Sequence, residues 1–177
     1  MKTPDVYILA TGGTIDKVHN EIEETLEFPR KSQVPLMLSD CKISNFKHRV
    51  IMLKDSLDMD DADRRLIYNE ILAVFEKSIV LTHGTSTMAE TAEYLKDKIV
   101  NKTVVLTGAM RPFAFSRSDA PFNFGAAVVA SQVLPPGVYV TMNGQVFEAG
   151  QVDKNIETGV FEGTAMAYAD IIKQGAA

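Results

Sequence analysis

The sequence contains a single cysteine, no tryptophan and only three histidines among its 177 residues. Because Cys41 has no second cysteine to pair with, an internal disulfide is excluded, and the composition suits the reducing cytoplasm. We expect Cys41 to be a small packing residue. His19, His48 and His83 lie far apart, and no two have the spacing that places metal ligands on one face, so no metal site is predicted.

Basic clusters and long apolar runs are also missing. The chain carries 18 Lys and Arg against 23 Asp and Glu, a formal net charge of −5. No segment has the concentration of positive charge that nucleic-acid binding requires. No apolar run approaches the ~18 to 20 residues that cross a bilayer, and Asp5 interrupts the first apolar stretch before a secretory core forms. We therefore expect no nucleic-acid partner, no membrane association and no signal segment.

The remaining composition is that of a folded globular domain. Hydrophobic residues make up 46% and charged residues 23%, and both kinds are spread along the chain. A chain of this length can bury one well-packed core, so residues 1–177 are expected to form a single domain with no second C-terminal domain.

Buried strands and amphipathic helices alternate along the chain. Strands are predicted for "VYILAT" (6–11), "HRVIML" (48–53), "SIVLTH" (78–83) and "TVVLTG" (103–108), and helices for residues 58–77, 87–98 and 118–134. In the first of these helices one apolar face is expected to comprise Leu66, Ile67, Ile71, Leu72 and Phe75. Because the strands are apolar throughout, both sheet faces should be covered. The pattern predicts an α/β fold with a mostly parallel sheet and helices on both faces.

A turn rich in glycine or hydroxyl residues lies at or just after the carboxyl end of each of the four predicted strands. These turns are "TGGT" (11–14), "DSLDMDD" (55–61), "THGTSTM" (82–88) and "TGAMRP" (107–112). In an open parallel sheet the ligand site lies at the carboxyl ends of the strands, so these turns should meet at one edge. The paired glycines of "TGGT" indicate a backbone left bare for close approach.

Each turn also has a simpler interpretation. "TGGT" could be a phosphate loop, but it lacks the lysine of a P-loop and the spacing of a dinucleotide fingerprint. "THGTSTMAE" could be a helix N-terminus in which Glu90 completes a capping box, and the acidic segment 20–28 is typical of a solvated surface. Lys154 alone would be a surface lysine.

Taken together, two threonines and a lysine point to nucleophilic catalysis. A threonine hydroxyl is a weak nucleophile until a base draws off its proton, which a lysine can do, with a second threonine relaying the proton between them. Thr14, Thr85 and Lys154 are the candidates. Bare glycine amides and the N-terminus of the helix after "THGT" could stabilise an oxyanion, a combination that suits acyl transfer.

At these residues the chain resembles the bacterial-type L-asparaginases. The resemblance rests on "ILATGGTID", "DSLDM", "VLTHGTSTMAETAEYL", "VVLTGAMRPFAFSRSDAPFNFGAAV" and the spacing from Asn143 to Lys154, and it covers most of residues 6–160. It implies hydrolysis of the side-chain amide of asparagine without a cofactor, on the fold of the N-terminal domain of the family. Thr14 would be the nucleophile, assisted by Thr85 and Lys154.

The resemblance also implies a substrate pocket. Ser56 falls where the family holds the substrate α-carboxylate, and Ala109 where a backbone carbonyl receives the substrate amide. The other expected substrate-binding residues are Gly13, Leu57, Gly84 and Ser86.

Three departures from the family pattern bear on the function. Ser86 stands where the family usually has an aspartate that pairs with the substrate ammonium, and a neutral hydroxyl makes no charge-assisted contact. The loop 16–29 lacks the tyrosine that the family carries there. The chain is expected to be a short-chain member, and because an open site would leave the lysine solvated, a partner subunit should cover it in a homo-oligomer, a dimer or tetramer.

The leading hypothesis is therefore an L-asparaginase. The alternatives are an amidohydrolase for glutamine or another amide, and a small amino-acid-binding module on the same fold.

Overall fold

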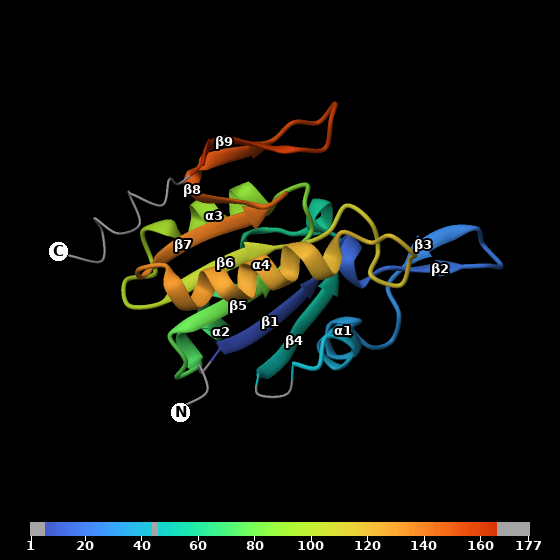
Figure 1. Cartoon of the computed structure of the whole chain (residues 1–177), viewed down its shortest axis with the longest axis horizontal. Helices are drawn as coiled ribbons and strands as arrows, with labels where there is room; N and C mark the ends of the chain where they lie inside the picture. The colour runs from blue at the N-terminus through green and yellow to red at the C-terminus, as the bar shows by residue number, and fades with distance from the viewer. Residues whose placement is uncertain (1–5, 44–45, 166–177) are drawn as a thin grey trace.

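The main feature of the computed structural model, which describes residues 6–43 and 46–165, is a seven-stranded sheet. Its strand order is β4-β1-β5-β6-β7-β8-β9 (Figure 1). The neighbouring pairs from β4 to β7 are parallel, and β8 and β9 extend the sheet in antiparallel fashion. The strands are β1 (Val6–Gly12), β4 (Lys47–Lys54), β5 (Ser78–Thr82), β6 (Thr103–Thr107), β7 (Gly137–Met142), β8 (Gln145–Lys154) and β9 (Phe161–Ala165).

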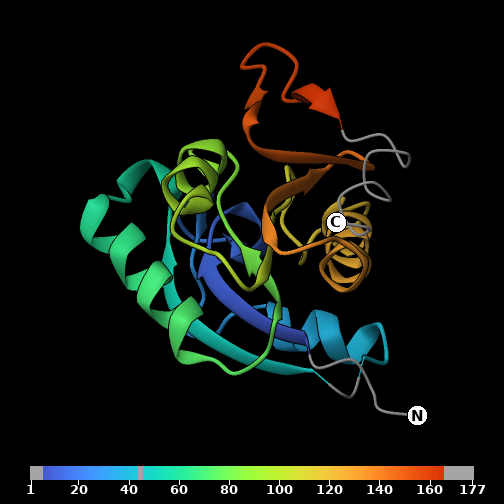
Figure 2. The ribbon, with the colours of Figure 1, turned by 90° about the vertical axis from the view of Figure 1, so that its left-hand side faces the viewer.

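Two helices cover each face of the sheet. They are α1 (Val34–Asp40), α2 (Asp61–Ala73), α3 (Met88–Lys96) and α4 (Ala120–Val133). One buried cluster joins the sheet to α2 and α3, and a second joins its opposite face to α1 and α4 (Figure 2). The central strands are buried along most of their length because both faces are covered, as their unbroken apolar sequence predicts. The predicted three-layer α/β fold is confirmed.

Helix α2 shows both the strength and the limit of the sequence pattern. Its N-terminus carries a capping box in which the Asp60 side chain accepts from the Asp63 amide while the Asp63 side chain accepts from the Asp60 amide. Ile67 and Ile71 are fully buried, as expected. The prediction that three further residues lie on the buried face was wrong, since Leu66, Leu72 and Phe75 are 42%, 51% and 98% exposed. The helix buries only a narrow stripe and ends at Ala73, before the phenylalanine.

The connection from β6 to β7 has the opposite hand from the other parallel connections. The connections through α2 and α3 run in one direction across the sheet over one face, and the connection through α1 runs in the reverse direction over the other face. Helix α4 runs in the same direction as α2 and α3 but over the face of α1. Since parallel crossovers are almost always right-handed, this one is left-handed. The segment 108–119 leads from the carboxyl end of β6 to the start of α4 on the face of α1.

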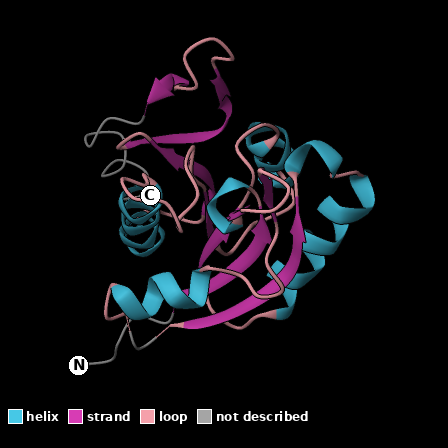
Figure 3. Cartoon of the chain, turned by 90° about the vertical axis from the view of Figure 1, so that its right-hand side faces the viewer, coloured by secondary structure: helices cyan, strands magenta, loops and turns pink. Residues whose placement is uncertain are grey.

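The strand order reverses between β1 and β5. From β1 the chain moves outward to β4 on one side, and from β5 it moves outward through β6 to β7 on the other. Ligands bind to open α/β sheets in the crevice at such a reversal, outside the carboxyl ends of the strands. Figure 3 shows the loops gathered at this edge.

Several elements differ from the sequence expectation. The acidic segment contributes to a hairpin of β2 (Val18–Asn20) and β3 (Thr25–Glu27), and residues 21–27 are exposed, as a solvated segment should be. Helix α1 was not predicted, and Cys41 at its end is exposed instead of packed. Beyond the four predicted strands, the sheet also contains β7, β8 and β9. Within the described ranges no helix is long and apolar enough to cross a membrane.

Candidate functional site

The glycines after β1 allow two neighbouring loops to touch. The Gly13 amide donates to the Lys54 carbonyl at 3.0 Å, and a Cβ on Gly13 would lie 2.4 Å from the Gly84 nitrogen. Gly12 and Gly13 have φ of 95° and 78°, in the left-handed region where side chains are strained. The pair of glycines is therefore required both by backbone conformation and by close approach. It joins the ends of β1, β4 and β5 at the reversal of strand order.

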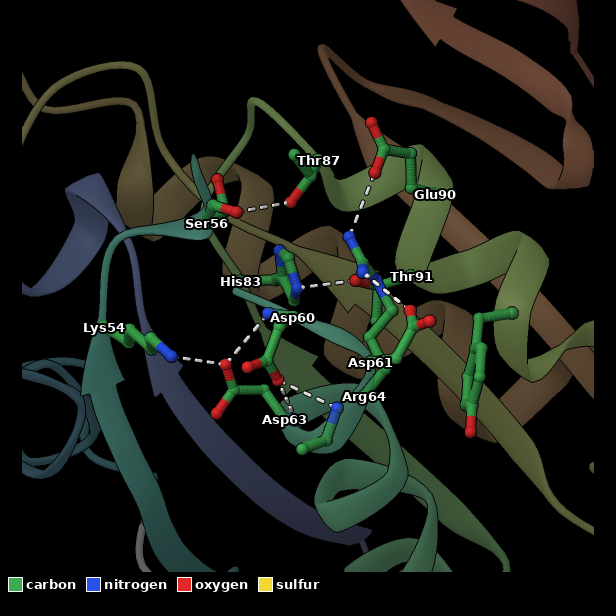
Figure 4. A network of polar contacts seen from close by, with 12 residues as sticks. Lys54, Ser56, Asp60, Asp61, Asp63, Arg64, His83, Thr87, Glu90 and Thr91 are labelled. Atoms are coloured by element: carbon green, nitrogen blue, oxygen red, sulfur yellow. Dashed lines mark hydrogen bonds and ion pairs between the residues drawn. The ribbon is translucent and has the colours of Figure 1, made fainter. Parts of the chain in front are cut away.

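Ser56 lies against the loop that follows β5. A Cβ on Gly84 would come 2.5 Å from the Ser56 Oγ, and Thr87 donates its hydroxyl to the Ser56 carbonyl at 2.8 Å (Figure 4). Ser56 is 1% exposed, and among the described residues its Oγ has no hydrogen-bond partner. Leaving a buried hydroxyl unpaired costs about 1–3 kcal/mol, so this oxygen is a candidate to bind a ligand.

Lys154 reaches the same loop from the antiparallel part of the sheet. Its Nζ donates to Thr85 Oγ1 at 2.9 Å, across 69 residues of sequence. Lys154 is the last residue of β8, and Thr85 follows Gly84 directly. The lysine is only half-buried, while Thr85 is buried. The structure thus brings together two of the three residues predicted to be catalytic.

Thr14 lies immediately after the glycine contact. It opens a short 3-10 helix, Thr14–Asp16, and is half-buried. Thr14 and Thr85 each follow one of the two contacting glycines, Gly13 and Gly84, so both threonines belong to the same junction of loops.

The other predicted site residues differ in exposure. Ala109 is fully buried at the start of the segment that follows β6. Leu57 is 73% exposed, and Ser86 is exposed as well. These two side chains therefore lie at the surface, next in sequence to Ser56 and Thr85.

His83 is a buried histidine with both ring nitrogens satisfied. Nδ1 lies 2.8 Å from the Gly84 carbonyl and Nε2 lies 2.9 Å from Thr91 Oγ1. Since a carbonyl only accepts, Nδ1 carries the proton and Nε2 accepts from the threonine. Burial lowers the pKa of His83 to about 4, so the ring is neutral near pH 7. It braces the loop between β5 and α3 from behind.

The capping box that the sequence offered as a simpler interpretation of "THGTSTMAE" does not form. The N-cap residue of α3, Thr87, makes no side-chain cap and instead bonds to Ser56. Glu90 pairs with Arg64 of α2, at 3.0 Å. The acid that the sequence suggested for a local cap links two helices (Figure 4).

Charged residues next to the site were missed from the sequence. Lys17 lies 2.5 Å from an Asp55 carboxylate oxygen, and this contact lowers the pKa of Asp55. Asp55 also caps the turn that carries Ser56, accepting from the Leu57 amide. The pair thus ties the segment after Thr14 to the Ser56 turn. Only the nearness of both residues to the motifs "TGGT" and "DSLD" could have suggested it.

Asp16 was also missed. Its Oδ1 accepts from the Ser32 hydroxyl at 2.7 Å and the Gln33 amide at 2.6 Å, while burial raises its pKa. The Asp16 side chain thus ties the end of the segment that contains the β2–β3 hairpin to the short helix that begins at Thr14. No group of three or more potential metal ligands gathers anywhere in the described part of the chain.

Comparison with known proteins places this arrangement in a family. A family model described as "Asparaginase, N-terminal" matches residues 5–171. The chain belongs to the asparaginase family. It is 34% identical to L-asparaginase 2 of Escherichia coli, over 89% of this chain and 48% of the relative. It is 28% identical to the glutaminase-asparaginase of Acinetobacter glutaminasificans, over 89% of this chain and 52% of the relative.

Solved structures of the family share the fold. The thermostable L-asparaginase from Thermococcus kodakarensis superposes with a TM-score of 0.80 at 28% identity, covering 93% of this chain and 53% of that one. L-asparaginase I from Vibrio cholerae gives a TM-score of 0.81 at 26% identity, covering 94% and 53%. The chain spans about half the length of the asparaginases that it matches.

Proposed function

We propose that this chain is an asparaginase that hydrolyses the side-chain amide of L-asparagine to L-aspartate and ammonia. The observation that carries the proposal is the bond from Lys154 Nζ to Thr85 Oγ1 at the junction of the glycine loops. A lysine and a threonine from distant parts of the chain meet one residue beyond the contact between Gly13 and Gly84. The family relationship supports the same chemistry.

In the proposed reaction the Thr14 oxygen attacks the amide carbon. The Thr14 proton passes to Thr85 as the Thr85 proton passes to the neutral Lys154 amine, and the electron pair of the C=O bond moves onto oxygen. Collapse of this intermediate breaks the C–N bond, and the nitrogen leaves as ammonia after taking the proton that Lys154 received. Water then attacks the acyl-threonine, which releases aspartate and restores the Thr14 hydroxyl.

The substrate would be held by groups already close to this junction. Ser56 Oγ, buried and unpaired among the described residues, is the proposed partner of the substrate α-carboxylate. The carbonyl of Ala109 is the proposed acceptor for the amide nitrogen. Gly13 and Gly84 supply backbone at the closest point of approach, and Leu57 and Ser86 are proposed to line the outer rim.

Replacement of Thr14 tests the proposal. Thr14→Ala should abolish ammonia release from asparagine, whereas Thr14→Ser keeps a hydroxyl and should retain part of the activity. Thr164→Ala, at an exposed position of β9, is the matched control and should leave turnover unchanged. Undiminished turnover by Thr14→Ala would refute the assignment of the nucleophile.

A second candidate substrate is glutamine or another amide. Ser86 supplies a neutral hydroxyl at the position where the resemblance implies a carboxylate for the substrate ammonium, which favours an amide that lacks an α-ammonium group. One relative is named as a glutaminase-asparaginase. A panel of amides assayed by ammonia release separates the two candidates.

We further propose that the chain works in the cytoplasm as a homo-oligomer, dimer or tetramer, in which a neighbouring subunit covers the site. Lys154 is half-buried in the single chain, and a neutral amine is easier to maintain away from water. Sedimentation that finds a fully active monomer would overturn this part of the proposal.

A further inference from the structure

Two asparagines outside the proposed machinery connect the wall of the site to the strand that carries Lys154. The first, Asn123 of α4, is 1% exposed. Its Nδ2 donates to the Gly108 carbonyl at 3.1 Å and to Asp119 Oδ2 at 3.0 Å. Asp119 in turn accepts from the amides of Met110 and Arg111, both at 2.9 Å. Asn123 and Asp119 thus hold the segment 108–119 against the start of α4.

The second asparagine, Asn143, links this segment to β9. The backbone amide of Asn143 donates to Asn123 Oδ1 at 3.2 Å, and Asn143 Oδ1 accepts from the backbone amide of Phe161 at 3.0 Å. Asn143 and Gly144 have φ of 54° and 76°, the two positive values of a type I′ hairpin turn between β7 and β8. Phe161 is paired in register with Lys154. The side chain of Asn143 therefore fixes the residue directly opposite the lysine.

These contacts close into a ring. Lys154 donates to Thr85, and a Cβ on Gly108 would lie 3.5 Å from Thr85 Cγ2. The path then runs from Gly108 through Asn123 and Asn143 to Phe161, and back to Lys154. Two members of the ring are residues of the proposed reaction, and the two asparagines are the polar links between its opposite sides.

We propose that Asn143, held by Asn123, is a positioning residue that sets Lys154 against Thr85; the inference rests on the proposed function of that pair. The hairpin of β8 and β9 is the outer edge of the sheet and extends away from the body of the molecule (Figure 1). A two-stranded hairpin is barely stable alone, so its attachments decide where its residues lie.

The attachment matters because the lysine side chain is long and loses rotamer entropy when it is fixed. If β9 shifts, its partner residue in β8 shifts with it, and the amine leaves the hydroxyl. A displacement of about 1 Å in a catalytic group can lower turnover about 100-fold. Phe161 is 1% exposed and packs in the core, so loss of the Asn143 bond should loosen the hairpin without unfolding it.

The chain offers a matched pair of substitutions at one position. Asn143→Gly removes the acceptor, while glycine adopts the left-handed turn freely. Asn143→Asp keeps an oxygen at the place of Oδ1 and also tolerates this turn. We expect the glycine variant to lose at least about 30-fold in kcat with KM changed by less than about threefold, and the aspartate variant to stay within about threefold of the parent. Retained kcat in Asn143→Gly, or an equal loss in both variants, would overturn the proposal.

A measurement independent of turnover separates this inference from the proposed function. With 13Cε-labelled lysine, the signal of Lys154 is assigned by its absence in Lys154→Arg, and its relaxation reports how firmly the side chain is held. The signal should show greater motion in Asn143→Gly and unchanged motion in Asn143→Asp. If the parent chain hydrolyses no asparagine, the proposed function fails and this readout still applies. Equal motion in the parent and the glycine variant would sink the positioning role.

Discussion

A single methyl group added at Gly13 should destabilise the protein strongly. Gly13 has φ 78° and ψ −177°, a conformation that only glycine adopts readily, and forcing another residue into it costs about 1–3 kcal/mol. The new Cβ would also lie 2.4 Å from the Gly84 nitrogen and 2.5 Å from its Cα. These are backbone atoms that cannot rotate away, and such overpacking adds about 1–3 kcal/mol. Gly13→Ala should therefore lower the free energy of unfolding by about 2–6 kcal/mol.

The same methyl group added at Gly125 is the control. Gly125 lies inside α4, and a Cβ there would meet no atom within 4 Å. Alanine is favoured over glycine in a helix interior, so Gly125→Ala should raise the free energy of unfolding by about 0.5–1 kcal/mol. Urea unfolding of both variants and the parent gives the two differences. Gly13→Ala within about 0.5 kcal/mol of the parent would refute the account of the glycine contact.

Two further predictions concern charge. The pKa of His83 is lowered to about 4, whereas an unfolded chain takes up the proton near 6.5, so the folded state should lose about 3 kcal/mol as the pH falls from 6.5 to 4. His83→Asn removes this titration, and its unfolding free energy should depend less on pH over that range; equal slopes for variant and parent would contradict the assignment. Ser86→Asp should lower the KM for asparagine about tenfold, because a carboxylate pairs with the substrate ammonium in a charge-assisted bond. An unchanged KM in the ammonia assay would show that the ammonium is bound elsewhere.

The convergence of the loops was predictable because parallel topology places every strand end at one edge. The four strands needed only apolar runs and turn signals, and "TGGT", "DSLD" and "THGT" then had to meet. Contacts such as Gly13 with Gly84 confirm that reasoning. The sequence pattern could not predict the hand of the crossover from β6 to β7. Helix α4 is largely apolar on both its faces and therefore fits either side of the sheet.

Side-chain partners were harder to predict than strand ends. Glu90 had a local sequence signal for a cap, but a guanidinium 26 residues away, on Arg64, competes for the same carboxylate. Phe75 fitted a helical face that ends at Ala73, before reaching it. In both cases the spacing of residues along the sequence shows neither a distant partner nor the point where a helix ends.

For Lys154 the sequence suggested the chemical role but did not give the position of the side chain. Its residue type and the threonine motifs suggested a base. Its position, however, depends on the antiparallel pairing of β8 with β9, where Asn143, eleven places earlier in the chain, bonds to the paired residue Phe161. In the sequence Asn143 signals only a turn, since "NG" is the usual pair of a type I′ hairpin. In the structure the same asparagine has a second role, because its side-chain carboxamide accepts a hydrogen bond from the Phe161 amide. Because the turn tolerates glycine, asparagine and aspartate, the comparison of Asn143→Gly with Asn143→Asp measures what the acceptor oxygen contributes to the position of Lys154.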